Sequence, residues 1–381
     1  MLAAGCLCGA GAWHIAARAQ APAEWKAPER FARPEISTDE GGLWALMDRE
    51  ETRLRRSPFS IKDPQLRDYI QEIACRLGAG HCPDLRVHLV RTPLFNASMA
   101  PNGMMQIWTG LLLRVDNEAQ LAAVIGHEIG HYLQRHSVER LRDAKSRSAF
   151  GTFLSLFGLV GAVGQLAVLA SAFAYSRDHE READRIGVAL MRDAGYDAAE
   201  ASKVWGNLLL EINARPGADP SRSNPMLATH PAPAERRDTL NQLAAAAPGG
   251  ATNEETWRTR TQSFRREWLA DEIKRGQHEE SIALLTRMIE RPPVLPEYLF
   301  ARGEVQRLRA KENDAENALS DFRAAITQGS EPAETHRSLG LLLRARNANE
   351  EAKTSFSRYL EMAPDAPDSA MIKTYLEEIK S

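Results

Sequence analysis

Apolar positions recur with two periods in the N-terminal two thirds of the chain, and together they predict a mixed fold. Helical spacing over residues 64–77 marks an amphipathic helix. Alternation over residues 84–90 predicts a strand, and a Pro-Asn-Gly turn inside residues 95–109 predicts a β-hairpin. Further helices are expected over four segments: residues 42–55, 177–194, 198–213 and 232–245.

One helix is marked more strongly than the others. Asn117 is a good N-cap residue, and the segment after it carries an apolar stripe with helical spacing. The stripe is formed by Leu121, Val124, Ile125, Ile129 and Leu133. The sequence therefore predicts a helix with one buried face that begins just after Asn117.

The C-terminal third repeats itself. Residues 333–366 carry Gly340, Ala352, Phe356 and Pro364 at the spacing of a tetratricopeptide repeat. A second copy begins near Pro296, and a weaker one precedes it. A run of alanines ending in Pro-Gly-Gly comes before the repeats and predicts a linker over residues 246–260.

Composition excludes some classes of function. The formal charge of −3 at pH 7 gives no indication of a nucleic-acid partner. The chain is 43% hydrophobic and 26% charged, which is ordinary for a globular protein.

The N-terminus is rich in small residues and ends in two small-x-small sites. Residues 1–21 are therefore interpreted as a secretory signal peptide whose basic start is truncated or misassigned; a disordered tail is the alternative. Export would allow Cys75 and Cys82 to close a short disulfide loop, whereas otherwise they are ordinary thiols.

Residues 148–176 contain no formally charged side chain. Their length suits a membrane span, but four glycines and the two flanking helices, which must meet at one site, favour a buried or cleft-covering element. Peripheral membrane contact and a true span are the alternatives.

The strongest chemical motif is His127-Glu128-Ile129-Gly130-His131. Residues four apart share a helix face, so both imidazoles can reach one metal ion while Glu128 acts as general base on a water. The sequence must also supply a third ligand.

Three placements compete for that ligand. A metzincin pattern fails because Gln134 and Ser137 occupy the required positions, so His136 is expected to be an ordinary surface residue. In a gluzincin pattern Glu180 binds the metal, while Asp184, one turn later, accepts the outer N–H of a ligating histidine. His179 is the local competitor, and we prefer Glu180 because Glu180 and Asp184 share a face.

Two histidines and one glutamate leave a fourth position for water, which is the arrangement of a catalytic zinc site. The developing oxyanion needs a partner, for which His230 and Arg236 are candidates. The alternative interpretation of the two is a loop histidine and a surface arginine.

The chain resembles the zinc peptidase family that includes HtpX and the CAAX prenyl proteases. The resemblance rests on the histidine motif, on Glu180 and Asp184, on Thr229-His230-Pro231 and on the residues around Asn96-Ala97-Ser98. The resemblance implies one zinc ion bound by His127, His131 and Glu180, with Glu128 as base. It implies that His230 can occupy the fourth zinc position in a latent state, with the catalytic candidate Arg236 nearby. The hairpin with Asn96, Ala97 and Ser98 would bind extended substrate as an edge strand.

The predicted fold is therefore α+β and mostly helical. It comprises a gluzincin-type metalloprotease domain with a small sheet over residues 22–245, the linker over 246–260, and an α-solenoid of tetratricopeptide repeats over 261–381.

The resemblance also implies a biological setting. It suggests a protease of the Gram-negative periplasm, soluble or membrane-associated, with chaperone-like activity in outer-membrane protein assembly and quality control. Its partners would be unfolded or stalled outer-membrane proteins and, through the repeats, the assembly machinery. The alternative is a mainly non-proteolytic chaperone or adaptor.

Overall fold

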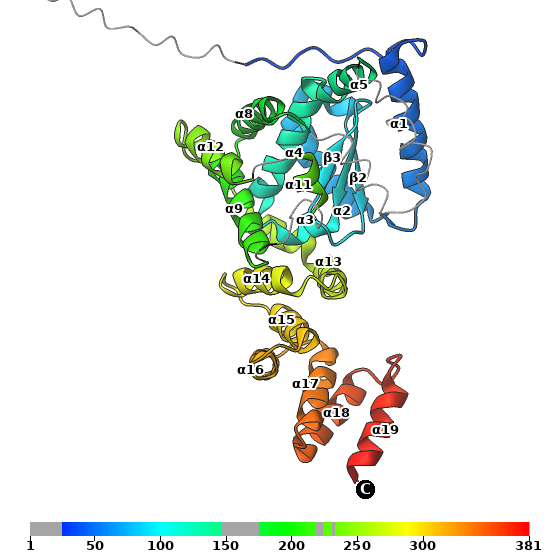
Figure 1. Cartoon of the computed structure of the whole chain (residues 1–381), viewed down its shortest axis with the longest axis vertical. Coiled ribbons are helices and arrows are strands. Elements are labelled where there is room, and N and C mark those ends of the chain that lie inside the picture. Colours follow the sequence, from blue (N-terminus) through cyan, green and yellow to red (C-terminus); the bar gives the residue numbers. More distant parts are fainter. Residues whose placement is uncertain (1–24, 147–174, 216, 218–223, 231–232, 381) are drawn as a thin grey trace, which may run out of the picture.

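The computed structural model of the protein describes residues 25–146, 175–215, 217, 224–230 and 233–380 (Figure 1). The predicted signal segment and nearly all of the uncharged stretch 148–176 lie outside these residues. Within the described part of the chain, no helix is both long and apolar enough to cross a membrane.

A four-stranded sheet stands at the centre of the N-terminal part. Its strand order is β1-β2-β4-β3, and β2 and β4 run parallel while the outer pairs are antiparallel. The predicted hairpin is confirmed, because β3 and β4 pair with Ser98 opposite Gln106. This order leaves β3 at one edge. The bounds are β1 (Ser60–Ile61), β2 (Arg86–Val90), β3 (Ala97–Met99) and β4 (Met104–Trp108).

Helices surround this sheet, and the predicted ones form within a few residues of their expected bounds. The N-cap predictions hold as well, since the Asn117 side chain accepts a hydrogen bond from the Gln120 N–H at 2.9 Å. The elements are α1 (Asp39–Arg56), α2 (Pro64–Gly78), η1 (Ala79–Asp84), α3 (Thr109–Arg114), α4 (Glu118–Leu133), α5 (His136–Ser146), α8 (Arg177–Asp193), α9 (Ala199–Asn213), α11 (Pro225–Thr229) and α12 (Pro233–Ala245).

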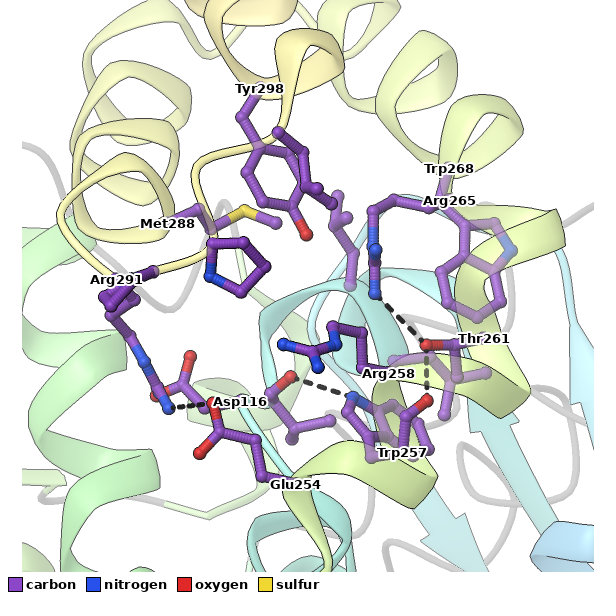
Figure 2. Close-up of a pocket in the computed structure, with 16 residues that line it drawn as sticks. Asp116, Glu254, Trp257, Arg258, Thr261, Arg265, Trp268, Met288, Arg291 and Tyr298 are labelled. Atoms are coloured by element: carbon purple, nitrogen blue, oxygen red, sulfur yellow. Dashed lines mark hydrogen bonds and ion pairs between the residues drawn. The ribbon is translucent and has the colours of Figure 1, made fainter. Parts of the chain in front are cut away.

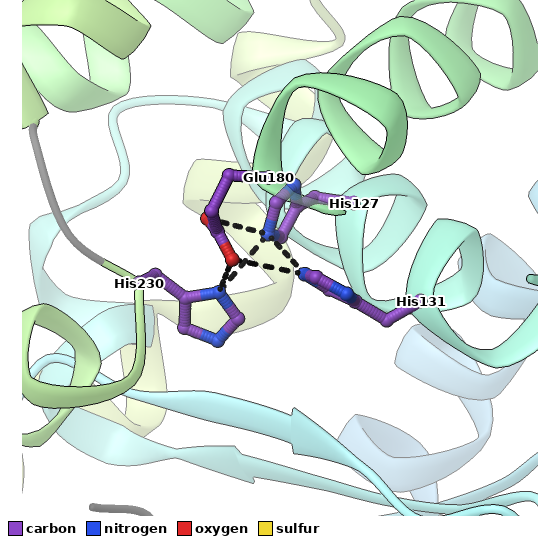
Figure 3. A group of neighbouring side chains, drawn as sticks. All are labelled: His127, His131, Glu180 and His230. Carbon is purple, nitrogen blue, oxygen red and sulfur yellow. Dashed lines mark hydrogen bonds and ion pairs between the residues drawn. The ribbon is translucent and has the colours of Figure 1, made fainter. Parts of the chain in front are cut away.

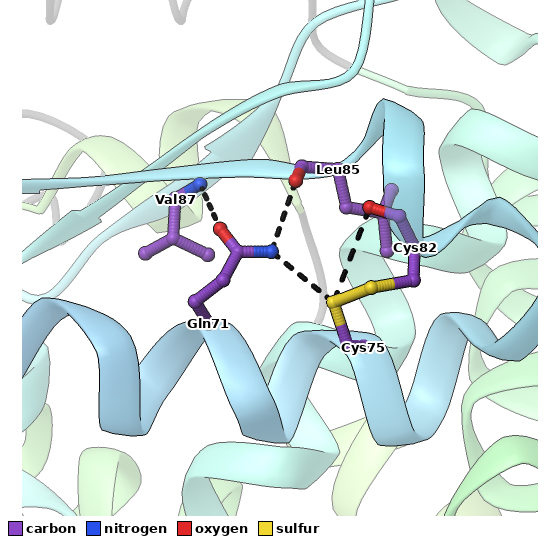
Figure 4. The surroundings of a disulfide bond; sticks show 5 residues. All are labelled: Gln71, Cys75, Cys82, Leu85 and Val87. Atoms are coloured by element: carbon purple, nitrogen blue, oxygen red, sulfur yellow. Dashed lines mark hydrogen bonds between the residues drawn. A yellow bond between two sulfur atoms is a disulfide. The ribbon is translucent and has the colours of Figure 1, made fainter.

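A disulfide ties α2 to the start of the sheet (Figure 4). Cys75 and Cys82 are joined, with their Cα atoms 4.6 Å apart. Beside the disulfide, the Gln71 amide donates to the Leu85 carbonyl and accepts from the Val87 N–H, both at 2.9 Å. Of the two alternatives for the cysteines, the structure has the disulfide.

The C-terminal part is wholly helical over its described residues and extends away from the sheet (Figure 1). In each repeat the glycine packs directly against the phenylalanine. A Cβ atom added at Gly303 would lie 2.7 Å from the Phe322 ring, and one added at Gly340 would lie 2.5 Å from the Phe356 ring, so neither position has room for a side chain. The tetratricopeptide assignment itself stays a prediction. The helices are α13 (Glu254–Lys274), α14 (His278–Ile289), α15 (Pro296–Arg309), α16 (Asp314–Gln328), α17 (Ala333–Ala345), α18 (Asn349–Met362) and α19 (Ser369–Lys380).

The hydrophobic core continues past the predicted linker. Part of residues 246–260 already belongs to α13, whose Trp257 and Trp268 are buried in the same core as α4. The Trp257 indole N–H donates to the Val115 carbonyl at 3.2 Å. A separate cluster begins only at Ala318 and includes Phe356.

Candidate metal centre

Helix α4 carries three of the predicted site residues: His127, Glu128 and His131. His127 and His131, four residues apart, project from one face with ring centroids 4.6 Å apart. Every residue of α4 is buried, so both imidazoles and the Glu128 carboxylate are shielded from bulk water.

Helix α8 lies against α4 closely enough to add a fourth group. A Cβ at Gly187 would lie 3.0 Å from the His127 backbone nitrogen, and one at Gly126 would lie 3.2 Å from the Gly187 carbonyl oxygen. The glycines therefore permit a backbone approach that side chains would obstruct. This approach brings Glu180, in the first turn of α8, beside the two histidines.

Four side chains converge at this point (Figure 3): His127, His131, Glu180 and His230 each offer a ligand atom, all within 4.8 Å of one another. His127 Nε2 lies 3.0 Å from His131 Nε2 and 3.2 Å from His230 Nδ1. Glu180 Oε1 lies 2.9 Å from His230 Nδ1 and 3.3 Å from His131 Nε2.

This donor set fits a zinc ion. Imidazole nitrogens and a carboxylate oxygen are ordinary zinc ligands, and four atoms held tetrahedrally at ~2.0–2.1 Å from a metal are about 3.3 Å apart. The four separations above, from 2.9 to 3.3 Å, lie at or slightly below that value. Both carboxylate oxygens of Glu180 approach the imidazoles, since the buried Oε2 lies 3.6 Å from His127 Nε2.

Residue His230 reaches the group from the C-cap of α11. Its Nδ1 faces His127 and Glu180, while its Nε2 lies 3.5 Å from Glu128 Oε1. His230 therefore stands between the other three groups and the Glu128 carboxylate. The competitor His179 does not join the cluster, and its ring instead stacks on His136 and lies 3.3 Å from the Glu139 carboxylate.

Behind the cluster, Asp184 Oδ1 lies 2.9 Å from His127 Nδ1. A carboxylate at that nitrogen fixes the tautomer in which Nε2 is free to bind metal. Arg236 is held there too: its Nε donates to Asp184 at 2.9 Å, and its guanidinium lies 3.8 Å above the Trp205 ring. Another of its nitrogens lies 3.2 Å from Glu180 Oε2.

The prediction for His136 was wrong. The residue is buried, 2% exposed, and its Nδ1 lies 2.9 Å from His131 Nδ1. The chain turns at Arg135, whose φ is 58°, so α5 folds back and carries His136 behind His131. If α4 continued as a helix past Leu133, His136 would not lie behind His131. The sequence pattern assumed such a continuous helix, so it did not predict this contact.

Tyr175 was also missed. Its ring stacks on His131 with centroids 3.8 Å apart, and its hydroxyl hydrogen-bonds Ser137 at 2.9 Å. The tyrosine closes the uncharged stretch 148–176, where it resembles any other apolar position. No spacing rule links it to the histidine motif.

Burial governs the protonation of these groups. It raises the pKa of Glu128 to about 7, against the lowering influence of the His230 and Arg236 charges and of the nearby Met99 N–H. Burial and the charge of Arg236 lower the pKa of His127 to about 4. Burial lowers the pKa of His230 as well, but the Glu180 and Glu128 carboxylates outweigh it and the net shift is upward.

Strand β3 lies beside this group at the sheet edge, which is where Asn96, Ala97 and Ser98 were expected to bind substrate. Asn96 and Ala97 are buried and Ser98 is half-buried. The Met99 backbone N–H lies near the carboxylate of the candidate base Glu128, so the strand borders the cluster. Substrate binding by these residues stays a prediction.

The sequence around this cluster is similar to known peptidases. Residues 60–244 match the model of Peptidase family M48. The chain is 30% identical over 212 residues to a putative beta-barrel assembly-enhancing protease of Vibrio cholerae, covering 51% of this chain and 42% of that protein. The Escherichia coli K12 beta-barrel assembly-enhancing protease matches equally, at 30% over 212 residues, with shares of 50% and 42%.

A mitochondrial relative matches the same kind of region. The mitochondrial metalloendopeptidase OMA1 of Arabidopsis thaliana is 33% identical over 156 residues, covering 41% of this chain and 31% of that protein. The matched regions thus span less than half the length of each of these three relatives. They agree with the predicted peptidase family.

Proposed function

Residues 60–244 belong to peptidase family M48, and from this premise we propose that the chain is a zinc-dependent endopeptidase. The observation that carries the proposal is the convergence of His127, His131, Glu180 and His230 on one point, with a separate buried carboxylate, Glu128, beside it. A purely structural zinc site has no need of that additional base.

In the proposed reaction, His127, His131 and Glu180 would hold a zinc ion, which would supply Lewis-acid activation of water and of the peptide carbonyl. Glu128 takes the proton of the attacking water and delivers it to the departing amine. A pKa of about 7 suits a group that must accept and release a proton near neutral pH. Arg236 keeps its Asp184 contact, so its part is to hold the carboxylate that orients His127.

Substrate would add to the sheet at β3. An extended peptide beside this edge would lie next to Glu128, because the Met99 N–H already lies near that carboxylate. Of Asn96, Ala97 and Ser98, Ala97 would then offer its backbone groups to the peptide, because the Asn96 carbonyl already accepts from the Trp108 N–H and Ser98 pairs with Gln106 of β4. Such main-chain recognition tolerates many side chains, which suits an enzyme that acts on unfolded segments.

Replacement of Glu128 by glutamine tests the chemistry. Glu128→Gln should retain zinc, because Glu128 is not a ligand, yet should cleave unfolded casein about 10²–10⁴-fold more slowly than the parent chain. Zinc content is measured by atomic absorption and cleavage by gel. The control is Glu255→Gln, at a carboxylate that is 73% exposed. Equal cleavage by Glu128→Gln and the parent chain would rule out Glu128 as base.

We also propose that His230 keeps the site latent. With His230 Nδ1 among the ligand atoms, the fourth position is closed to water, so the loop that carries His230 must move before turnover. His230→Ala should therefore raise the casein cleavage rate severalfold while zinc stays bound. His278→Ala, which removes a histidine far along the chain on α14, is the control. A lower rate in His230→Ala would identify His230 as a participant in the chemistry instead.

The biological role is proposed at a coarser level. The names of the bacterial relatives support a metallopeptidase that acts in outer-membrane protein assembly. We propose unfolded or stalled outer-membrane proteins as its clients. The Cys75–Cys82 disulfide supports an oxidising compartment such as the periplasm. The C-terminal helices would dock onto the assembly machinery, as tetratricopeptide stacks do with partners.

A non-proteolytic chaperone or adaptor is the second candidate, favoured by the position of His230 inside the ligand group. The Glu128→Gln variant separates the two roles in cells. Loss of client degradation with unchanged outer-membrane assembly would support the chaperone role. Loss of both would support the peptidase alone.

A further inference from the structure

A second cavity lies apart from the metal centre, between the segment that leads into α4 and helices α13, α14 and α15 (Figure 2). Its volume of about 80 Å³ is several times the ~10–15 Å³ that one water molecule requires. Its apolar walls are formed by Leu113, Val115, Trp257, Trp268 and Leu295.

One wall carries a buried guanidinium without a carboxylate partner. Arg265 is 7% exposed, and its Nη1 has no hydrogen-bond partner within the described residues. Its one hydrogen bond to the described residues, from Nη2 to the Thr261 hydroxyl, is long at 3.4 Å. No carboxylate of the described chain lies within ion-pair distance of it, although a buried charge without a counter-charge is costly.

The acidic groups that line the same cavity are already engaged. Asp116 is paired with Arg287 and Arg291, and Glu254 is bound by Arg291 at 3.0 Å. They therefore leave the Arg265 charge uncompensated.

Two further donors face this space (Figure 2). The Tyr298 hydroxyl points into the cavity and has no hydrogen-bond partner among the described residues, while the Arg265 guanidinium lies 5.6 Å from the Tyr298 ring. Arg258 stands at the rim and is 36% exposed, and among the described residues its one ion-pair partner is the exposed Glu255. Donors and positive charge thus converge on a space whose remaining walls are apolar.

We propose that this cavity binds a carboxylate carried on an apolar group, with the carboxylate on Arg265 and Tyr298 and the apolar group against Trp257 and Trp268. A guanidinium binds a carboxylate through strong, directional hydrogen bonds, and the bound anion would supply the counter-charge that the protein lacks there. The free C-terminus of a polypeptide ending in an apolar residue, or a small free acid, offers this chemistry. The site goes beyond the proposed peptidase function and does not depend on it.

Calorimetric titration of the whole chain tests the site. The probes are N-acetyl-leucine, its carboxamide, and 4-methylpentanoate, which has the same apolar group without the amide. We expect the two acids to bind at least about tenfold more tightly than the carboxamide. Tighter binding of N-acetyl-leucine than of 4-methylpentanoate would assign the site to polypeptide termini, and the reverse order to small acids. Equal binding of acid and carboxamide, or no binding of either acid at millimolar concentration, overturns the proposal.

Variants locate the binding. Arg265→Gln should weaken N-acetyl-leucine binding at least about tenfold. Arg266→Gln removes the same charge from an exposed neighbour on α13 and should leave binding unchanged. Tyr298→Phe, which removes one oxygen, should weaken acid binding severalfold even if Arg265→Gln fails to fold. Unchanged acid affinity in Tyr298→Phe and in a folded Arg265→Gln contradicts the assignment. Glu128→Gln should bind the acids as the parent does, which keeps this test independent of the peptidase reaction.

Discussion

Hydrogen bonds behind the candidate ligands determine how each imidazole is presented. Asp184 takes the outer nitrogen of His127, and His136 faces the outer nitrogen of His131 at 2.9 Å. If His131 binds metal through Nε2, its Nδ1 carries the proton and His136 Nδ1 must accept it. The remaining proton of His136 then sits on Nε2, which lies 3.4 Å from the Glu182 carboxylate.

Substitution of His136 should therefore weaken metal binding. His136→Ala leaves the His131 N–H buried without an acceptor, and loss of such a partner typically lowers metal affinity ~10–100-fold. His136→Asn, whose amide oxygen can take the place of Nδ1, should recover most of that loss. Zinc dissociation constants measured against a chromophoric chelator give both values. If alanine and asparagine variants bind zinc equally well, the hydrogen bond has no part in holding His131.

At the scale of elements, two contacts hold the parts of the catalytic region in place. Helix α8 approaches α4 across Gly126 and Gly187, and helix α1 is fixed to β2 through Glu51. The buried Glu51 carboxylate binds Arg86 at 2.7 Å and His88 at 2.9 Å, both from β2. Burial raises the pKa of Glu51, but the hydrogen bonds from His88, Arg86 and Arg55 outweigh it and lower the net pKa far below 4.5.

This lowered pKa gives a prediction for stability. A carboxyl group with a depressed folded-state pKa stabilises the fold above its unfolded pKa, and that contribution is lost as pH falls through the folded-state value. Glu51→Gln should therefore lower the free energy of unfolding at pH 7, and the difference from the parent should shrink as pH falls below about 4.5. Urea unfolding at several pH values measures it. A difference that stays constant down to pH 3 would contradict the linkage.

At the scale of the whole molecule, a buried ion network connects the catalytic region to the C-terminal helices. Arg114, at the end of α3, binds Glu211 of α9 at 2.8 Å and Glu272 of α13 at 3.0 Å. Glu272 also accepts from Arg275 and from Ser281 of α14. The C-terminal helices are thus anchored through charges that are enclosed, as well as through the shared core.

Removal of Arg114 should be strongly destabilising. Arg114→Met leaves the Glu211 and Glu272 carboxylates buried without their shared cation, a change that typically costs about 3–5 kcal/mol. The comparison is Arg323→Met, where Arg323 and Glu351 form an exposed pair worth about 0–1 kcal/mol. Denaturant unfolding measures both variants. Similar losses in the two would mean that the network does not hold the parts together.

Much of the fold follows from local signals. The apolar stripe of α2 and the N-cap and apolar stripe of α4 place those two helices within a few residues, because capping and amphipathic spacing are properties of short segments. Strand β1 was not expected, since two residues are too few for alternation to appear. The parallel pairing of β2 with β4 could not be predicted either, because it depends on contacts between segments that no local period encodes.

For the metal centre, the sequence by itself determined which residues could act together on each helix. His127 and His131 share one helical face, as do Glu180 and Asp184, because a four-residue spacing fixes direction whatever surrounds the helix. Only the tertiary structure decided what completes the site. The turn at Arg135 brings His136 behind His131. Away from the metal centre, the packing of α13, α14 and α15 against the segment before α4 likewise encloses Arg265. Such neighbours are set by how distant segments pack, and spacing along one chain carries no measure of that distance.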